Sequence, residues 1–390
     1  MELYENFILN ERHEKIVNEV DQLAMKLKEY RSKADKMATI PEESIHILKE
    51  ANYMSWTLPQ EYGGKELSLY EFLLAQEKLA QGDGAVALSL GWHLGVVKEL
   101  ADDRNWDHEI FDFLATDISQ HQKLVNRLAT EPATGSPTRG GIPETKAIRD
   151  GNQYRINGRK SFATMAEVLG YYIVTAHVEE KDAIGSFLIP RETPGIHVEK
   201  TWDTLGMRGT GSDDVVLKDV TIPANYLVEM SEKPKRPGPK GWLLHIPACY
   251  LGIAIAARND IIDFARNFQP NSLNTPISEV DHIQTKIGEM ELKLLQARYF
   301  MYTVADKWDN YPANRSQLLG EMGAVKMVAT NAANEIVDLA MRIAGGRGLA
   351  KSMPFEQYYR DVRAGLHNPP MDDMVIRLLA KQAINNRSNE

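Results

Sequence analysis

Cysteine is nearly absent from this chain: Cys249 is the one thiol among 390 residues. A single thiol forms no intrachain disulfide and none of the paired spacings of a zinc site, so we predict no metal centre and a reducing, cytoplasmic location. The apolar neighbours of Cys249 favour a buried, inert thiol over a nucleophile. No apolar run approaches the ~20 residues that span a bilayer, and the N-terminus lacks a signal-peptide pattern, so we expect no membrane partner.

An excess of positive charge is also lacking. The chain has 45 Lys and Arg against 54 Asp and Glu, a net charge of −9, which disfavours nucleic acid as a partner. The usual motifs of nucleotide hydrolysis, zinc proteases, serine hydrolases and thiol redox enzymes are missing. Gly345 and Gly346 open a glycine-rich segment, but it follows a predicted helix and not a strand, so by itself it is typical of a helix end.

The pattern of apolar residues divides the chain into three domains of an α+β protein. Residues 1–123 show helical spacing and predict an all-helical domain. Residues 124–230 contain short runs rich in β-branched and aromatic residues, separated by turn dipeptides at Asp150 and Asn157, and predict an antiparallel β-sandwich or barrel. Residues 231–390 begin with a Pro- and Lys-rich linker, Ser231–Gly241, and predict a four-helix-type bundle, with a heptad seam from Met322 to Ile343.

Two segments supply the mixture of donors and apolar surface that a planar ligand needs. The stretch ATEPATGS, Ala129–Ser136, offers backbone amides and short hydroxyls at the entrance to the β-domain. The stretch NGRKSFAT, Asn157–Thr164, adds an aromatic ring and a hydroxyl at the end of a strand. Each segment alone is also compatible with an ordinary turn.

The ordered set of motifs resembles the acyl-CoA dehydrogenase superfamily of flavoproteins over essentially the whole chain. The matching pieces are LATEPATGS, INGRKSFAT, TPGIHV, DTLGMRGTGSDDVVLKDVTIP and AMRIAGGRGLAKSMPFEQYYRDVR. The resemblance implies the three-domain fold above, a flavin between the β-domain and the bundle, and a homotetramer or homodimer. The cofactor-binding residues it implies are Leu128, Ala129, Thr130, Gly135, Ser136, Phe162, Ala163, Thr164, Arg342, Gly345, Gly346 and Asn368.

The identity of the flavin stays open between FAD and FMN. Family members that hold FAD commonly use an Arg-x-x-Phe-Gly segment and a later Gln, which reach across a subunit interface. The corresponding residues here include Pro270 and Asp281 and offer no guanidinium. Arg266 or Arg342 could compensate, so FAD is favoured and FMN is the alternative.

The glutamate that serves as catalytic base in many of these dehydrogenases is missing. Counted from Arg360, its position falls on Pro369, and the alternative position early in the first bundle helix falls on Trp242. Neither side chain accepts the α-proton of an acyl thioester. Asp372 and Asp373 are the remaining carboxylates nearby, although acidic residues in a first helical turn are ordinary.

The segment Leu366–Pro369, LHNP, is similar to the Leu-His-Asp-Pro of the flavin-dependent monooxygenase branch of the same superfamily. That resemblance implies catalytic roles for His367, His93 and Thr164, because imidazole can stabilise a peroxy anion. A buried core histidine is the alternative interpretation of His93, and a structural loop histidine that of His367.

Three functions follow, in order of preference. The first is α,β-dehydrogenation of an acyl-CoA-type thioester with an atypical base and a separate electron acceptor. The second is monooxygenation by reduced flavin, supplied by a reductase, and oxygen through a C4a-hydroperoxide. The third is a flavin-binding relative that no longer catalyses. The length of the acyl chain and the electron partner are not fixed by the sequence.

Overall fold

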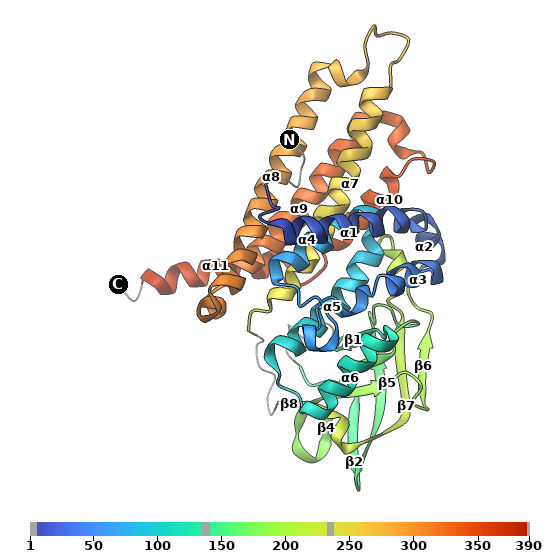
Figure 1. The fold of residues 1–390 in the computed structure, drawn as a ribbon, viewed down its shortest axis with the longest axis vertical. Coiled ribbons are helices and arrows are strands. Elements are labelled where there is room, and N and C mark those ends of the chain that lie inside the picture. Colours follow the sequence, from blue (N-terminus) through green and yellow to red (C-terminus); the bar gives the residue numbers. More distant parts are fainter. Residues whose placement is uncertain (1–5, 134–140, 232–237, 388–390) are drawn as a thin grey trace.

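The computed structural model describes residues 6–133, 141–231 and 238–387. A sheet forms one end of the molecule, and long helices form the other (Figure 1). The helices are α1 (Glu11–Lys28), α2 (Arg31–Met37), α3 (Glu42–Glu50), α4 (Leu69–Gly82), α5 (Gly84–Asp103), α6 (His108–His121), α7 (His245–Asn267), α8 (Asp281–Asn310), α9 (Leu319–Ala344), α10 (Phe355–Gly365) and α11 (Asp372–Arg387). The strands are β1 (Val125–Leu128), β2 (Lys146–Asp150), β3 (Gln153–Lys160), β4 (Tyr171–Val178), β5 (Ala183–Pro190), β6 (Ile196–Glu199), β7 (Asp214–Pro223) and β8 (Leu227–Ser231).

Local capping fixes where the central helices begin. Ser68 and Glu71 form a reciprocal capping box at the start of α4, as the sequence predicts. The Asp83 carboxylate then accepts the backbone N–H groups of Ala85 and Val86 and so starts α5. Most of α5 is buried, in agreement with its apolar sequence.

The β-domain is one sheet in the order β6-β7-β3-β2-β4-β5-β8, with β1 paired to β4. The predicted antiparallel arrangement holds for most pairs, but both β1 and β2 run parallel to β4. Parallel pairing requires a long connection, and about forty residues that contain β2 and β3 separate β1 from β4. The domain is therefore a mixed sheet.

The turn predicted at Asn157–Gly158 is wrong, because both residues lie inside β3. A β-bulge against β7 falls there, and a Cβ on Gly158 would lie 2.3 Å from the Thr145 Oγ1 atom. This glycine permits the close approach of a neighbouring chain segment. The turn predicted at Asp150–Gly151 does join β2 and β3.

The C-terminal helices form the predicted bundle, in which α9 packs against α7, α8 and α10. The heptad seam of α9 is buried from Met322 to Ile343, apart from the half-buried Leu339. The helix ends at Gly345, whose positive φ of +59° is one that glycine adopts without strain. The bundle thereby fixes the position of the glycine-rich segment that follows.

Helix α7 is the core helix that connects the bundle to the N-terminal domain. Its region Gly241–Asn267 is long and apolar enough to cross a membrane, but 89% of its most apolar stretch is buried inside the fold. Cys249 lies on this helix and is fully buried, with its thiol donating to the Gly84 carbonyl oxygen. Burial raises the pKa of this thiol well above its ordinary value, which supports the prediction of an inert cysteine.

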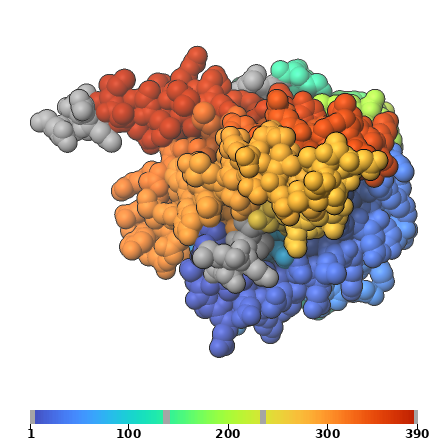
Figure 2. Space-filling model, turned by 90° about the horizontal axis from the view of Figure 1, so that it is seen from above, coloured from blue at the N-terminus to red at the C-terminus, as the bar shows by residue number. Residues whose placement is uncertain are grey.

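Helix α11 projects away from the body of the molecule (Figures 1 and 2). Its exposed apolar residues include Ile376, 53% exposed, and Ile384, 67% exposed. Isolated exposed apolar residues are normal, but a projecting helix that carries several is typical of a surface that another chain covers.

A half-buried charge cluster connects the N-terminal domain to the sheet. Arg127 of β1 donates to both carboxylate oxygens of Glu229 on β8, at 2.9 and 2.7 Å, and lies 3.5 Å from Glu99 of α5. Desolvation alone would raise the pKa of Glu229, but the hydrogen bonds from Arg127 and from Trp106 hold this pKa at about 2.

This cluster predicts a specific loss of stability in acid. The folded-state pKa of Glu229 lies below its unfolded value, so its contribution is complete above about pH 4.5 and is lost as the pH falls toward 2. We expect Glu229→Gln to lower the free energy of unfolding by about 1–2 kcal/mol at pH 7, after allowance for solvent screening, and by much less at pH 3. Urea denaturation at both pH values measures the difference, and an equal loss at both would contradict the assignment.

Candidate functional site

Two segments predicted to hold a flavin meet at one end of the sheet. Leu128 ends β1, and Ala129 and Thr130 follow it. The Thr130 carbonyl oxygen accepts a hydrogen bond of 2.9 Å from the backbone N–H of Ser161, the residue directly after β3. The structure thus brings residues 128–130 beside residues 161–164, which lie some thirty positions later in the chain.

A buried ion pair fixes this junction. The Lys160 Nζ atom lies 2.5 Å from a carboxylate oxygen of Glu131, and both side chains are almost fully buried. Glu131 also accepts hydrogen bonds from the Thr145 hydroxyl and from the backbone N–H groups of Thr145 and Glu144. Although burial opposes ionisation, these bonds lower the pKa of Glu131, so the carboxylate stays charged. Both residues lie inside the two quoted motifs, but no local pattern in the sequence predicts that they pair.

A chain of three hydroxyl groups lies beside the junction. The Thr164 Oγ1 atom is 3.0 Å from the Ser212 Oγ atom, which is 2.8 Å from the Thr210 Oγ1 atom. Thr210 in turn donates to the Met207 carbonyl oxygen. Sequence reasoning identified Thr164 and missed the other two hydroxyls. The available signal was their position in the segment GMRGTGSDD, where Thr210 lies between two glycines and Ser212 directly follows the second.

Phe162 offers an exposed aromatic face at the same place. Its side chain is 65% exposed, while the next residue, Ala163, is buried. Its φ is +56°, and that of Met165 in the same turn is +66°, so two residues that are not glycine adopt the left-handed conformation. Such strain persists where the surroundings impose it and is concentrated at ligand sites. The Trp202 ring stands edge-on to Phe162 at 5.8 Å between centroids and supports it.

The loop between β6 and β7 is fixed from both sides. Within the loop, the Asp213 carboxylate accepts the backbone N–H groups of Thr201 and Trp202. From the bundle, the Asp361 carboxylate of α10 accepts the backbone N–H of Met207 at 2.6 Å. Burial raises the pKa of Asp361 to about 7. The loop that carries Ser212 is therefore attached to the bundle as well as to the sheet.

His93 lies in the core, away from any described cavity. It is fully buried on α5, one ring nitrogen accepts the backbone N–H of Val125, and the other lies 2.8 Å from the Met54 carbonyl oxygen. Burial lowers its pKa to about 4, so the ring is neutral. This placement favours the core interpretation of His93 over the catalytic one.

His367 and Asn368 lie on the segment that joins α10 to α11. His367 is exposed, and Asn368 accepts a hydrogen bond of 2.7 Å from the Tyr250 hydroxyl of α7. The next residues, Pro369 and Pro370, are joined by a cis peptide bond. Tyr250 thus holds the segment in place and leaves the imidazole of His367 accessible.

Asp372 lies in the first turn of α11 and contacts α9. One of its carboxylate oxygens accepts the Asn331 side-chain amide at 2.8 Å, and the other lies 3.6 Å from the Lys326 Nζ atom. Both partners belong to α9. These contacts support the structural interpretation of Asp372 over a displaced catalytic base.

The predicted residues Arg342, Gly345 and Gly346 line a separate surface cavity of about 620 Å³ where α9 ends and α10 passes. The guanidinium of Arg342 is largely exposed and bonds to Asp338. Arg360, on the same cavity, also donates to the carbonyl oxygen of Leu205 in the loop between β6 and β7. The structure does not place this group in direct contact with the junction. Gly135 and Ser136 lie outside the described residues.

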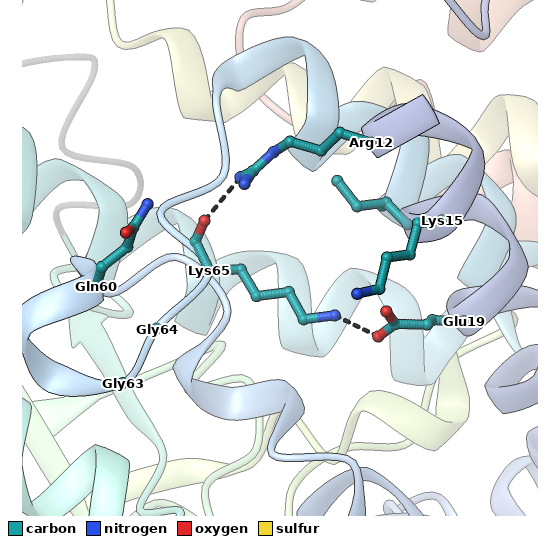
Figure 3. A pocket seen from close by; sticks show the side chains of 8 residues that line it. Arg12, Lys15, Glu19, Gln60, Gly63, Gly64 and Lys65 are labelled. Atoms are coloured by element: carbon teal, nitrogen blue, oxygen red, sulfur yellow. Dashed lines mark hydrogen bonds and ion pairs between the residues drawn. The ribbon is translucent and has the colours of Figure 1, made fainter. Parts of the chain in front are cut away.

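Another surface hollow, of about 420 Å³, lies between α1 and the loop before α4 (Figure 3). Two of its basic side chains are engaged: Arg12 bonds to Glu71 and to the Lys65 carbonyl, and Lys65 pairs with Glu19. It contains none of the predicted site residues.

Three family models match successive parts of the chain. They describe the N-terminal domain (residues 10–102), the middle domain (residues 127–220) and the C-terminal domain (residues 244–366) of acyl-CoA dehydrogenase. "Putative acyl-CoA dehydrogenase YdbM" from Bacillus subtilis is 47% identical over 377 residues, which cover 97% of this chain and 98% of that protein.

Solved structures agree with the fold. Butyryl-CoA dehydrogenase from Megasphaera elsdenii superimposes with a TM-score of 0.84 at 22% identity, over 96% of this chain and 99% of the other. KijD3 in complex with FMN and an amino-keto sugar nucleotide superimposes with a TM-score of 0.85 at 22% identity, over 97% and 95%. At this identity the two structures show the fold alone.

Proposed function

We propose, from the premise that the chain belongs to the acyl-CoA dehydrogenase family of flavin-dependent oxidoreductases, that it is a flavin-dependent monooxygenase. Its substrate is a small molecule with an oxidisable sulfur or nitrogen atom. One oxygen atom of O₂ enters the substrate, and the other leaves as water with two hydrogens delivered by the reduced flavin. A flavin reductase is the partner that this reaction needs.

The proposal is supported by the residues at the two positions where the resemblance to dehydrogenases places the catalytic base. By that resemblance these positions fall on Pro369 and Trp242, and neither residue is a carboxylate. The neighbouring Asp372 is bonded to α9, and Asp361 to the backbone of Met207. Removal of an α-proton requires a positioned base with a matched pKa, and proline and indole supply none.

Dehydrogenation of an acyl-CoA-type thioester is the second candidate. The name of the Bacillus subtilis relative favours it, because that protein shares 47% identity with this chain over nearly its full length. This reaction would require an atypical base and an electron acceptor in place of oxygen.

The donor set at the junction fits a flavin. Ala129 and Thr130 lie half-buried after the end of β1, the hydroxyls of Thr164 and Ser212 offer hydrogen bonds, and the exposed ring of Phe162 offers an apolar wall. Leu128 and Ala163 are buried behind them. A bound reduced flavin would supply the two electrons of the reaction.

Residues of the chain then act around the bound cofactor. We propose that His367 stabilises the negative charge that develops as oxygen is reduced, because an imidazole donor suits an oxyanion. Tyr250 positions His367 through its hydrogen bond to Asn368. Thr164 would donate to the cofactor, and Ser212 and Thr210 would orient its hydroxyl.

Two reactions with the flavin-loaded protein distinguish the candidates. The first mixes it anaerobically with butyryl-, octanoyl- and palmitoyl-CoA and follows the visible absorbance of the flavin. The second supplies reduced flavin, a reductase and ¹⁸O₂ together with thioethers, thiophenes and amines. We expect no bleaching in the first and ¹⁸O-labelled product in the second.

Bleaching by a thioester would overturn the monooxygenase proposal and establish the dehydrogenase. If neither reaction occurs, both catalytic proposals fail, and the chain is a flavin-binding relative without this chemistry.

The surface cavity predicts how the protein distinguishes FAD from FMN. We propose that Arg342, Gly345 and Gly346 hold the outer phosphate and adenine part of an FAD that extends from a neighbouring copy. Arg342→Ala should then weaken FAD binding about tenfold, the value of one charge-assisted hydrogen bond, and leave FMN binding unchanged. Titration calorimetry measures both, with Arg149→Ala on β2 as control. Equal affinity for FAD before and after the change would remove Arg342 from the site.

We propose a homodimer or homotetramer as the working form. The exposed apolar residues of the projecting α11, together with Leu292 and Leu295 on α8, support it. Light scattering should give a multiple of the 43.9 kDa chain mass, and a single 43.9 kDa species would contradict the proposal. The single buried cysteine supports a cytoplasmic location.

A further inference from the structure

One face of α9 supports the segment that joins α10 to α11 and carries His367, and both flanking helices pack on α9 (Figure 1). Toward α10, the Asn334 side-chain amide donates to the Val362 carbonyl oxygen at 3.0 Å. Toward α11, a Cβ on Gly323 would lie 3.2 Å from a methyl group of Val375. The segment therefore spans a single face of α9, about three helical turns long.

Lys326 occupies this face of α9, one turn after Gly323 and two turns before Asn334. Its side chain is only 3% exposed, and its Nζ atom makes no hydrogen bond in the part of the chain that the structure describes. Burial lowers the pKa of this amine, and the charge of Asp372 opposes the shift. A buried ammonium group without a hydrogen bond costs stability, so its presence needs an explanation.

The Asp372 carboxylate, in the first turn of α11, is the group that faces Lys326. The Lys326 Nζ atom lies 3.6 Å from one of its oxygens, an ion-pair distance that is too long for a hydrogen bond. That oxygen is buried and has no hydrogen-bond partner among the described residues, whereas the other accepts the Asn331 amide at 2.8 Å. Lys326 therefore acts on the start of α11 through its charge.

The segment between the two helices is held at both ends. Before the prolines, the Tyr250 hydroxyl donates to Asn368, and the backbone N–H of His367 donates to the Ala364 carbonyl oxygen at 3.0 Å. After the prolines, Asp372 is held by α9. An exposed side chain keeps a defined position only if the backbone that carries it is fixed from both sides.

We propose that Lys326 is a positioning residue, whose charge holds Asp372 and thereby keeps residues 366–371 in the place that directs His367 toward the cofactor site. The inference deepens the proposed function and rests on it for the role of His367. Apolar residues of similar size are often neutral or stabilising in place of a buried charge. A lysine retained here at a cost in stability is therefore expected to serve the reaction and not the fold.

The main test compares flavin-loaded Lys326→Met with the parent protein. Methionine keeps most of the apolar stem of lysine and removes the charge, while Asp372 is 36% exposed and keeps its bond to Asn331. We expect the urea midpoint to stay equal or to rise. Hydrogen exchange followed by mass spectrometry should be at least tenfold faster in the peptide that contains the His367 amide, and unchanged in the sheet.

A second variant interrupts the same contact from the other side. Asp372→Asn keeps an acceptor for Asn331 and removes the charge, so it should speed exchange at His367 equally, and it serves as the test if Lys326→Met does not fold. Because both changes remove one contact, the double variant should exchange no faster than either single variant.

Lys307→Met is the matched control. This lysine of α8 also pairs with a carboxylate of α9, Glu321, at 2.9 Å, but both side chains are exposed and neither contacts the segment that carries His367 in any described bond. Its midpoint and its exchange at His367 should equal those of the parent.

Turnover gives an independent readout. In the ¹⁸O₂ assay, Lys326→Met should lower kcat about ten- to a hundredfold, the usual effect of a small misplacement of a reacting group, with little change in KM or in flavin affinity.

Unchanged exchange at His367 in both single variants would overturn the positioning role, and so would an unchanged kcat in Lys326→Met. A large fall of the urea midpoint together with faster exchange throughout α9 would also overturn it, because the pair would then serve the fold alone. Faster exchange at His367 in a protein whose parent form transfers no oxygen would support the positioning role and count only against the proposed function.

Discussion

Replacing Lys160 by methionine is expected to lower the free energy of unfolding by about 3–5 kcal/mol, the usual loss when one partner of a buried ion pair is removed. The change leaves the Glu131 carboxylate buried with its hydrogen bonds but without its counter-charge. Urea denaturation followed by circular dichroism measures the effect. The same variant should bind flavin more weakly, because the pair holds the ends of β1 and β3 together beside the Thr130–Ser161 hydrogen bond.

Two further variants separate the charge from the packing. Lys146→Met removes an exposed lysine from the neighbouring strand β2, where its partner is Glu179, and should change stability little. Adding Glu131→Gln to Lys160→Met removes the uncompensated charge while keeping acceptors for Thr145, so it should restore much of the lost stability. If Lys160→Met proves as mild as Lys146→Met, the buried pair does not hold the junction.

Replacing His367 by alanine is expected to reduce oxygen-dependent turnover about a hundredfold, the typical effect of deleting one donor that stabilises a developing oxyanion. Flavin affinity and the unfolding midpoint should stay near those of the parent, because the His367 side chain is exposed. Steady-state rates of ¹⁸O incorporation measure the effect. His46→Ala, an exposed histidine on α3, is the matched control.

Whether His367→Ala changes kcat or KM gives a second readout. If His367 only shapes the loop, Tyr250→Phe, which removes the hydrogen bond to Asn368, should change turnover as much as His367→Ala does. If His367 is catalytic, His367→Ala should lower kcat with little change in the KM for the substrate. Unchanged kcat would exclude His367 from the reaction.

Much of this architecture could be predicted because its signals are local. The capping box at Ser68, the seam of α9 and the glycine end at Gly345 each depend on residues within a few turns of one another. The order of the domains follows from the change of apolar period along the chain. The composition of two segments predicts that they bind a cofactor, and the structure brings residues 128–130 and 161–164 together.

The remainder depends on contacts that the sequence does not encode locally. Asn157–Gly158 has the composition of a turn, but Gly158 instead makes room for Thr145 within a strand. His93 looked like a relative's catalytic histidine, and its bonds to Met54 and Val125, each more than thirty residues away, show a core environment. The hydroxyls of Thr210 and Ser212 join Thr164 only because the backbone of their loop bonds to residues 163–166, which follow β3.

The burial of Cys249 has a practical consequence for spectroscopy. Since its thiol is inaccessible and resists ionisation, maleimide or nitroxide reagents should leave the folded protein unlabelled. A cysteine introduced at the exposed Lys381 of α11 would then be the single reactive thiol per chain. Pulsed dipolar measurements between such labels would report how the projecting helices of neighbouring copies are spaced, without any background site to remove first.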